Sequence, residues 1–196
     1  MRLAILSRRL AISFSLIFDS GGFAMSNHTS PADEAFFAAV GRLTLSWGHL
    51  GIALDSMVEI MYHGFGGREI EPEMPRQLQR KITFLRKAFK KLPIGQKAIQ
   101  GYLKLFDQVE SAAQTRHDII HGAVIEYAER SGEATMVRVT RHGERVTKKR
   151  FKVTTRSIFK AAIDAQKLGS KVFYWLNEFH AVAEKLLQQR DEQNPS

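Results

Sequence analysis

Apolar residues recur at alternating steps of four and three along much of the chain, the spacing that buries one face of a helix. The first such stripe begins after Ser30-Pro31, where a cap residue precedes proline at the first helical position, and it ends at the glycines of residues 64–67. A second stripe covers about 75–92, and a third runs from the break at residues 93–95 to Gly122. We expect Gly122 to form a left-handed helix cap.

The periodicity changes between residues 123 and 154, where short β-rich runs are separated by Ser131-Gly132 and His142-Gly143. We interpret this segment as a β-hairpin or a three-stranded meander. A long fourth helical stripe follows from about Thr155. The sequence therefore predicts an all-α protein, an antiparallel bundle of four and up to five helices, with the small β insertion placed before the last long helix.

The chain fits a single helical domain over residues 25–190, followed by a polar tail, 191–196, that we expect to fray. Residues 1–24 differ, because arginines precede a short apolar run at 11–18. They are either a signal-like extension, in which case the protein is exported, or sequence upstream of a true start at Met25. We favour the second interpretation and a cytoplasmic protein. No later stretch approaches the ~20 apolar residues of a membrane span, so we expect no membrane partner.

The composition favours a polyanionic partner. The 196-residue chain has a net charge of +9, and its lack of cysteine excludes disulfides and thiolate chemistry. Two basic segments, one in the second helix and one in the β insertion, are candidates for tracking a nucleic-acid backbone, although a solvated surface is an alternative explanation. The candidate nucleic-acid-binding residues are Arg80, Lys81, Arg86, Lys87, Lys90, Lys148, Lys149 and Arg150.

The segment from Thr115 to Gly122 concentrates the candidate chemistry. It places the guanidinium of Arg116 and the imidazoles of His117 and His121, with Asp118 between them, within about one and a half helical turns. The two histidines are four residues apart and share a helix face. Arg116 continues the buried stripe of the third helix through to Ile120, and a charge there is costly unless it is paired or lines a cleft.

Structural alternatives stay open for both key residues. Arg116 has candidate ion-pair partners in Asp55, Glu59 and Asp107, and His121 suits a helix C-terminus without any further role. On an ideal helix Arg116 and His121 lie about 140° apart. A shared phosphate site therefore needs a bent last turn or a second copy of the chain.

The run Arg116-His117-Asp118-Ile119-Ile120-His121 resembles the Arg, polar residue, several residues, His signature of the HEPN superfamily of small helical nucleotide-binding and ribonuclease domains. Arg42 and His49 have a similar spacing, so spacing alone does not support the resemblance. It depends on the surrounding residues: a polar residue follows the arginine, a glycine follows the histidine, and the helix ends there. The resemblance implies a homodimer with both motifs in one cleft, and metal-independent RNA cleavage without a cofactor. It also suggests a toxin or defence system with an antitoxin or regulatory partner. Many members have Asn where this chain has His117.

If RNA is the substrate, His121 is the expected general base on the ribose 2′-hydroxyl, and Arg116 neutralises the charge that develops on the phosphate. His117 or Asp118 orients the reacting groups or donates a proton, and the product is a 2′,3′-cyclic phosphate. Two other hypotheses remain. One is a non-catalytic helical interaction module with Arg116 in a structural salt bridge. The other is a phosphohydrolase with a metal at His117-Asp118, for which the sequence offers no further clear ligand.

Overall fold

The structure, a computed structural model, describes residues 30–193, with side chains described over residues 30–181 except His142. The expectations for residues 1–24, and for the last three residues of the predicted tail, lie outside the described part of the chain. From Ala32 onward the described residues belong to one compact unit.

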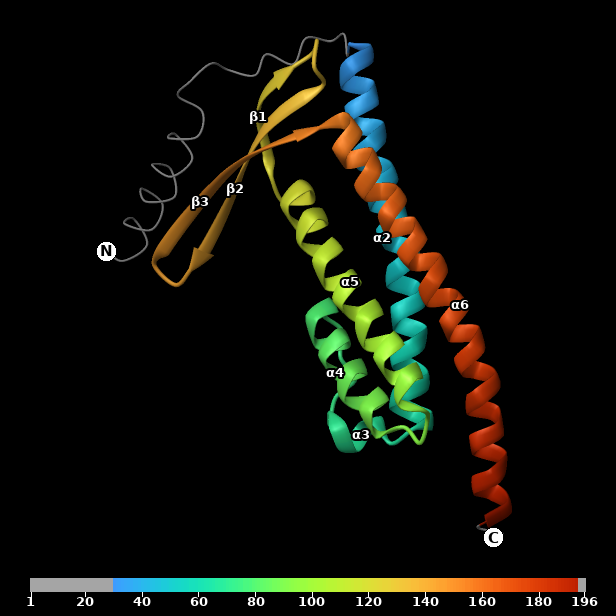
Figure 1. Ribbon diagram of the computed structural model, residues 1–196. Coiled ribbons are helices and arrows are strands. Elements are labelled where there is room, and N and C mark those ends of the chain that lie inside the picture. Colours follow the sequence, from blue (N-terminus) through green and yellow to red (C-terminus); the bar gives the residue numbers. More distant parts are fainter. Residues whose placement is uncertain (1–29, 194–196) are drawn as a thin grey trace. The chain divides into compact units, whose positions relative to one another are not determined.

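The described chain is mostly helical, with a small antiparallel sheet before the last long helix, as the sequence predicted (Figure 1). Its elements are α2 (Pro31–Gly64), α3 (Gly67–Ile70), α4 (Leu78–Lys91), α5 (Gln96–Ile120), β1 (Ala123–Ala128), β2 (Glu133–His142), β3 (Arg145–Thr154) and α6 (Thr155–Gln193). The short helix α3 was not predicted, because four residues carry no periodic stripe. Helix α6 continues to Gln193, so residues 191–193 of the expected tail are helical.

Local sequence signals set the helix boundaries. Helix α2 begins at Pro31 and ends at Gly64, after which Gly66 adopts a left-handed conformation with φ of 67°. Helix α6 starts with a reciprocal cap, in which the Thr154 amide donates to Ser157 Oγ at 2.9 Å and the Ser157 amide donates to Thr154 Oγ1 at 3.0 Å. Among residues 30–193, no helix is long and apolar enough to cross a membrane.

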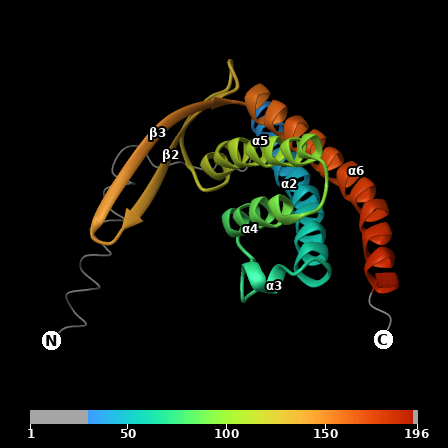
Figure 2. The ribbon, with the colours of Figure 1, turned by 60° about the horizontal axis from the view of Figure 1, so that its bottom comes forward.

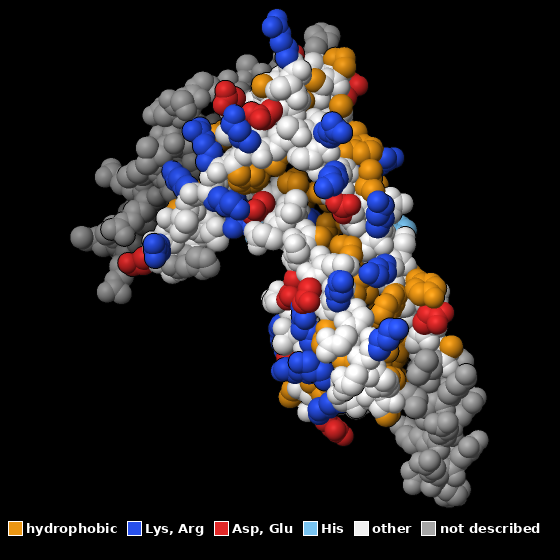
Figure 3. Space-filling model, viewed as in Figure 1, with side chains coloured by type: hydrophobic (Ala, Val, Ile, Leu, Met, Phe, Trp, Pro, Cys, Tyr) orange, Lys and Arg blue, Asp and Glu red, His pale blue; other side chains and the backbone are white. Residues whose placement is uncertain are grey.

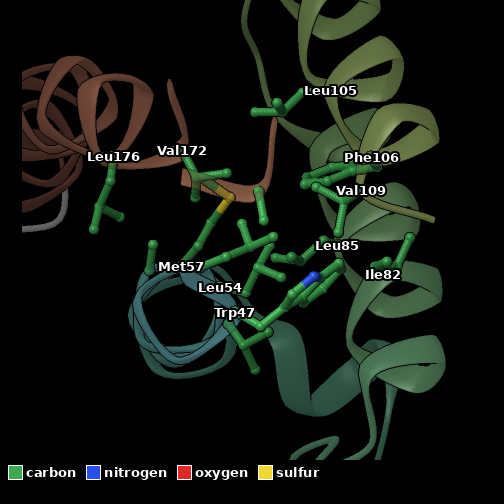
Figure 4. Packing of buried hydrophobic residues seen from close by; sticks show 14 of the residues in the cluster. Trp47, Leu54, Met57, Ile82, Leu85, Leu105, Phe106, Val109, Val172 and Leu176 are labelled. Atoms are coloured by element: carbon green, nitrogen blue, oxygen red, sulfur yellow. The ribbon is translucent and has the colours of Figure 1, made fainter. Parts of the chain in front are cut away.

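The core lies between the four long helices, and each predicted stripe contributes to it (Figure 4). Buried side chains from α2 meet those of α4 and α5 on one side and those of α6 on the other. The labelled members of this cluster are Trp47, Leu54, Met57, Ile82, Leu85, Leu105, Phe106, Val109, Val172 and Leu176. Burial of such side chains contributes about 1.5–3 kcal/mol each, which makes the helical body the main source of stability.

The β insertion is a three-stranded meander in the order β1-β2-β3. Glycines with φ of 60° at Gly132 and Gly143 form the two turns, as the turn residues in the sequence indicated. Strands β2 and β3 pair along ten residues each, whereas β1 reaches only to Val137 of β2. The far part of the β2–β3 hairpin therefore has two strands, and it extends away from the helices in both views (Figures 1 and 2).

Candidate active site at the end of helix α5

The motif helix runs almost directly into the sheet. Helix α5 ends at Ile120, the His121 amide donates to the His117 carbonyl at 3.1 Å, and β1 begins two residues later. Gly122 does not have a positive φ, so the predicted left-handed cap is wrong. Instead, a Cβ at Gly122 would lie 2.7 Å from the Asp118 carbonyl oxygen. This Cβ would also lie 3.0 Å from Met136 of β2 and 3.2 Å from Phe151 of β3, so the absence of a side chain lets the end of the helix lie close to both strands.

Asp118 joins the motif to the sheet. Its carboxylate accepts hydrogen bonds from Arg138 on β2, from Lys149 on β3 at 2.7 Å, and from Gln114 on α5 at 3.0 Å. Arg138 and Lys149 are opposite each other in the β2–β3 register. The side chains of Asp118 and Arg138 are 14% and 17% exposed, so this ion pair is largely shielded from water, whereas Lys149 is 51% exposed.

These contacts set the charge of the carboxylate. Burial acts to raise the pKa of Asp118, but the hydrogen bond from Lys149 and the charges of Arg138 and Lys149 outweigh it, and the pKa falls below its ordinary value. Asp118 is therefore ionised at neutral pH. It is suited to positioning its neighbours, and the proton-donor role considered from the sequence is unfavourable for it.

The two histidines of the motif are in contact. The ring centroids of His117 and His121 lie 4.6 Å apart, as their i, i+4 spacing indicated, and both residues reach solvent. Desolvation, the charge of Arg138 and the neighbouring His121 lower the pKa of His117, and Asp118 opposes this shift. His117 is therefore predominantly neutral at pH 7 and can accept a hydrogen bond or a proton.

Arg116 is half-buried, and its Nε is buried without a hydrogen-bond partner. The spacing predicted that Ile120 would be the next buried residue after Arg116. In the structure Ile119 is buried instead, at 5% exposure, and Ile120 is only partly buried. The charge of Arg116 is close enough to His117 to contribute to lowering the pKa of that histidine. A buried donor without a partner costs on the order of 1–3 kcal/mol, so this nitrogen would gain from a hydrogen bond to a ligand or to water.

Two of the three acids considered as structural partners of Arg116 have other ion-pair partners. Asp55 pairs with Lys81, and Asp107 accepts from Arg86 at 2.7 Å. No acid among the described residues, Glu59 included, forms an ion pair with Arg116. Within the described residues, Arg116 therefore has no structural salt bridge.

The predicted nucleic-acid-binding residues divide into two groups. On α4, Arg80 pairs with Glu71, Lys81 with Asp55, and Arg86 with Asp107 and Glu110, so these cations are already engaged within the protein. Lys149 on β3 pairs with Asp118 of the motif. The remaining candidates on α4 and β3 form no ion pair with any described residue. These unpaired and exposed residues are Lys87, Lys90, Lys148 and Arg150.

Sequence analysis missed Arg138, which is the shielded partner of Asp118. Its signal was the alternation in β2, where Ala134 and Met136 are buried and Arg138 is the next residue on the same face. A cation that continues an apolar face needs a partner, as Arg116 does on α5. The Nε of Arg138 also lacks a hydrogen-bond partner.

Within the described residues, no group of three or more His, Cys, Asp or Glu side chains is arranged to hold a metal ion. Comparisons of the chain with protein-family models, with curated proteins and with solved structures found no match. The candidate site therefore stands on its own residues: Arg116, His117, Asp118 and His121 of the motif, with Arg138 and Lys149 of the sheet.

Proposed function

We propose that this protein is a HEPN-like RNA-binding protein that cleaves RNA by attack of the ribose 2′-hydroxyl, without a metal ion. The observation that carries the proposal is the buried, unpartnered guanidinium nitrogen of Arg116 next to two histidines that contact each other. A fork-shaped cation beside imidazole groups combines phosphate binding with proton transfer, which are the two tasks that phosphodiester cleavage requires. The antiparallel bundle expected from the sequence is also the arrangement that the HEPN resemblance implies.

Each residue of the motif has a role in this proposal. His121 takes the proton from the 2′-hydroxyl, the oxygen attacks the adjacent phosphorus, and the 5′-oxygen leaves as an alcohol after taking a proton from water. Arg116 stabilises the charge on the phosphate oxygens while the bond forms and breaks. His117 orients His121 through the ring contact. Asp118, which Arg138 and Lys149 hold ionised, is a positioning residue.

A second copy of the chain is part of the proposal. Phe37, Leu45 and Ile52 on α2 are 60%, 73% and 62% exposed, and Gly41 and Gly48 lie between them with open space around the position of a Cβ. Steps of four and three place these five residues on one helix face, opposite the core stripe. Large side chains that alternate with gaps can interlock with the same surface of another copy, and a soluble monomer rarely exposes such a face.

Light scattering on the purified protein tests the dimer. Leu45→Glu places a charge in the middle of this face and should give a monomer at concentrations at which the unmodified protein is dimeric. Met74→Glu changes an apolar residue that is 42% exposed elsewhere and should leave the dimer intact. A monomeric unmodified protein would refute the dimer, and the α2 face would then fit the antitoxin or regulatory partner, in keeping with the non-catalytic interaction module.

An RNA cleavage assay with EDTA tests the activity. We expect Arg116→Ala and His121→Ala each to lower cleavage by about 10²–10³-fold, the loss typical of a removed charge stabiliser or general base. Arg42→Ala and His49→Ala are matched controls, since this pair has a similar spacing on α2 but lies outside the motif. Equal cleavage by all variants would refute the mechanism. Cleavage that stops only on chelation would support a metal at His117-Asp118 instead.

A further inference from the structure

The end of the β2–β3 hairpin concentrates positive charge. We call residues 137–150 the β-arm. It contains six Lys or Arg and one Glu, a net charge of +5 out of +9 for the whole chain. Strand β1 reaches only the first residue of the arm, Val137, so the remainder is a two-stranded ribbon. Blue side chains follow this hairpin in the space-filling view (Figure 3).

The register sorts the cations of the arm onto two faces. Arg138 and Lys149 form one opposed pair, and both turn toward Asp118. The neighbouring pairs, Val137 with Arg150 and Val139 with Lys148, therefore present their side chains on the other face. Arg141 lies on this outer face as well, opposite Val146, and the alternation there is between cations and valines.

The outer-face cations are available to a ligand. Lys148 and Arg150 are exposed, and neither forms an ion pair with a described residue, in contrast to most of the candidate cations on α4. Two residues along a strand span about 6.6–6.8 Å, a spacing at which neighbouring cations can each meet a different phosphate of one backbone. This face is therefore suited to a polyanion with regularly spaced charges.

The arm has no large aromatic side chain for stacking bases. Residues 137–150 include no Phe, Tyr or Trp. The aromatic side chains of the sheet, Tyr127 and Phe151, pack against the helical core instead. Proteins that bind single strands without sequence preference rely on aromatic platforms as well as on positive charge. A duplex hides its bases and offers its phosphates in fixed rows, which a flat ribbon with cations and small aliphatic side chains can contact.

We propose that the outer face of the β-arm binds the phosphate backbone of duplex RNA. The opposite face of the arm meets the catalytic motif through Lys149, so the ribbon separates a bound duplex from the histidines, and only RNA that extends beyond the stem can reach them. Cleavage by the 2′-hydroxyl needs this oxygen in line with the leaving oxygen, an arrangement that the regular backbone of a duplex does not provide. The preferred substrate is therefore an RNA in which a stem adjoins an unpaired segment. The choice of RNA over DNA and this last step rest on the proposed ribonuclease function, whereas binding of a duplex backbone does not.

Fluorescence anisotropy at several salt concentrations tests the proposal. The probes are an RNA duplex of roughly 16 base pairs, about the length that a double-stranded-RNA-binding domain covers, each of its strands alone, and the DNA duplex of the same sequence. We expect the RNA duplex to bind most tightly. Lys148→Ala/Arg150→Ala should weaken it on the order of tenfold and lower the slope of log K against log salt by about two, because two phosphate contacts are lost.

The matched control is Lys97→Ala/Lys104→Ala, which removes two exposed cations of α5 that form no ion pair with a described residue and should change duplex affinity less than about twofold. Equal effects of the two double variants would overturn the assignment to the arm. Tighter binding of a single strand or of the DNA duplex would overturn the ligand class. Because Lys148 and Arg150 have no ion-pair partner in the described protein, thermal unfolding of the arm variant should match that of the unmodified protein.

The same materials separate this proposal from the ribonuclease function. Binding that depends on the arm without cleavage of any RNA would refute the ribonuclease and support the arm. If the unmodified protein cleaves RNA and the arm variant still binds the duplex equally well, the duplex-binding role of the arm is refuted and the ribonuclease function is not. In a stem-loop RNA we expect cleavage in the unpaired segment next to the stem, and cuts confined to base-paired positions would overturn the proposed substrate.

Discussion

Asp118→Asn removes one negative charge from the junction between α5 and the sheet while keeping the shape of the side chain. A hydrogen bond to a charged group contributes about 1.5–3 kcal/mol, against roughly 0.5–1.5 kcal/mol for a neutral one. For the shielded bond from Arg138 the change therefore costs about 1–1.5 kcal/mol. The bond from Lys149, which is 51% exposed, adds less than about 1 kcal/mol. We expect the free energy of unfolding at pH 7 to fall by about 2 kcal/mol in all.

The pH dependence of this loss follows from the lowered pKa of Asp118 in the folded protein. A carboxylate with a depressed folded pKa stabilises the protein fully above its unfolded pKa, about 3.9, and loses that contribution as the pH falls through the folded pKa. The unmodified protein loses this stability in acid, whereas the Asn variant has no such contribution to lose. The difference between them should therefore be constant at neutral pH and shrink below about pH 4.

Urea unfolding followed by far-UV circular dichroism, repeated from pH 7 to the acid range, measures this difference. Asp164→Asn is the matched control, because Asp164 is exposed on α6 and forms no ion pair with a described residue, so its change should stay within about 0.5 kcal/mol. Equal stability of Asp118→Asn and the unmodified protein at pH 7 would refute the network. A difference that persists unchanged in acid would show that the charge of Asp118 is not its source.

Gly122→Ala should lower the free energy of unfolding by about 1–3 kcal/mol, since its Cβ would lie 2.7 Å from a backbone oxygen, whereas Gly51→Ala, with nothing within 4 Å, should raise it by roughly 0.5–1 kcal/mol. A stabilised Gly122→Ala protein would contradict the close approach. An NMR titration should place the pKa of His117 below its ordinary value. Asp118→Asn should lower this pKa further and Arg138→Gln should raise it, because the two charges act in opposite directions, and shifts of the reverse sign would refute the assigned causes.

The sequence predicted the helices and the meander because each leaves a long periodic signal. The stripe of α2 and the glycine turns at Gly132 and Gly143 are local properties, and local geometry decides them. The contact between His117 and His121 was predictable for the same reason, since one turn of a helix brings them together.

The partners of charged residues were not predictable, because they depend on which surfaces meet in space. Among the described residues Arg116 forms no ion pair, and two of the acids considered for it, Asp55 and Asp107, pair with Lys81 and Arg86 of α4 instead. Asp118 meets Arg138 across 20 positions of sequence only because the sheet folds back on the helix end. The sequence also suggested the wrong reason for Gly122. A glycine that is needed for a positive φ and one that is needed because a side chain would not fit look the same in a sequence.

Strand β3 lies at the edge of its sheet, so within the described part of the chain a row of its backbone N–H and C=O groups faces no partner strand. Open edges of this length invite pairing with another chain, and lysine and arginine on the edge oppose it by mutual repulsion. Lys148, Lys149, Arg150 and Lys152 thus protect the hairpin against strand-to-strand aggregation, whatever they bind. Replacing them to suppress RNA binding would also weaken this protection. If the arm binds RNA as proposed, Lys148 and Arg150 serve both ligand affinity and resistance to aggregation, and a substitution made for one property changes the other.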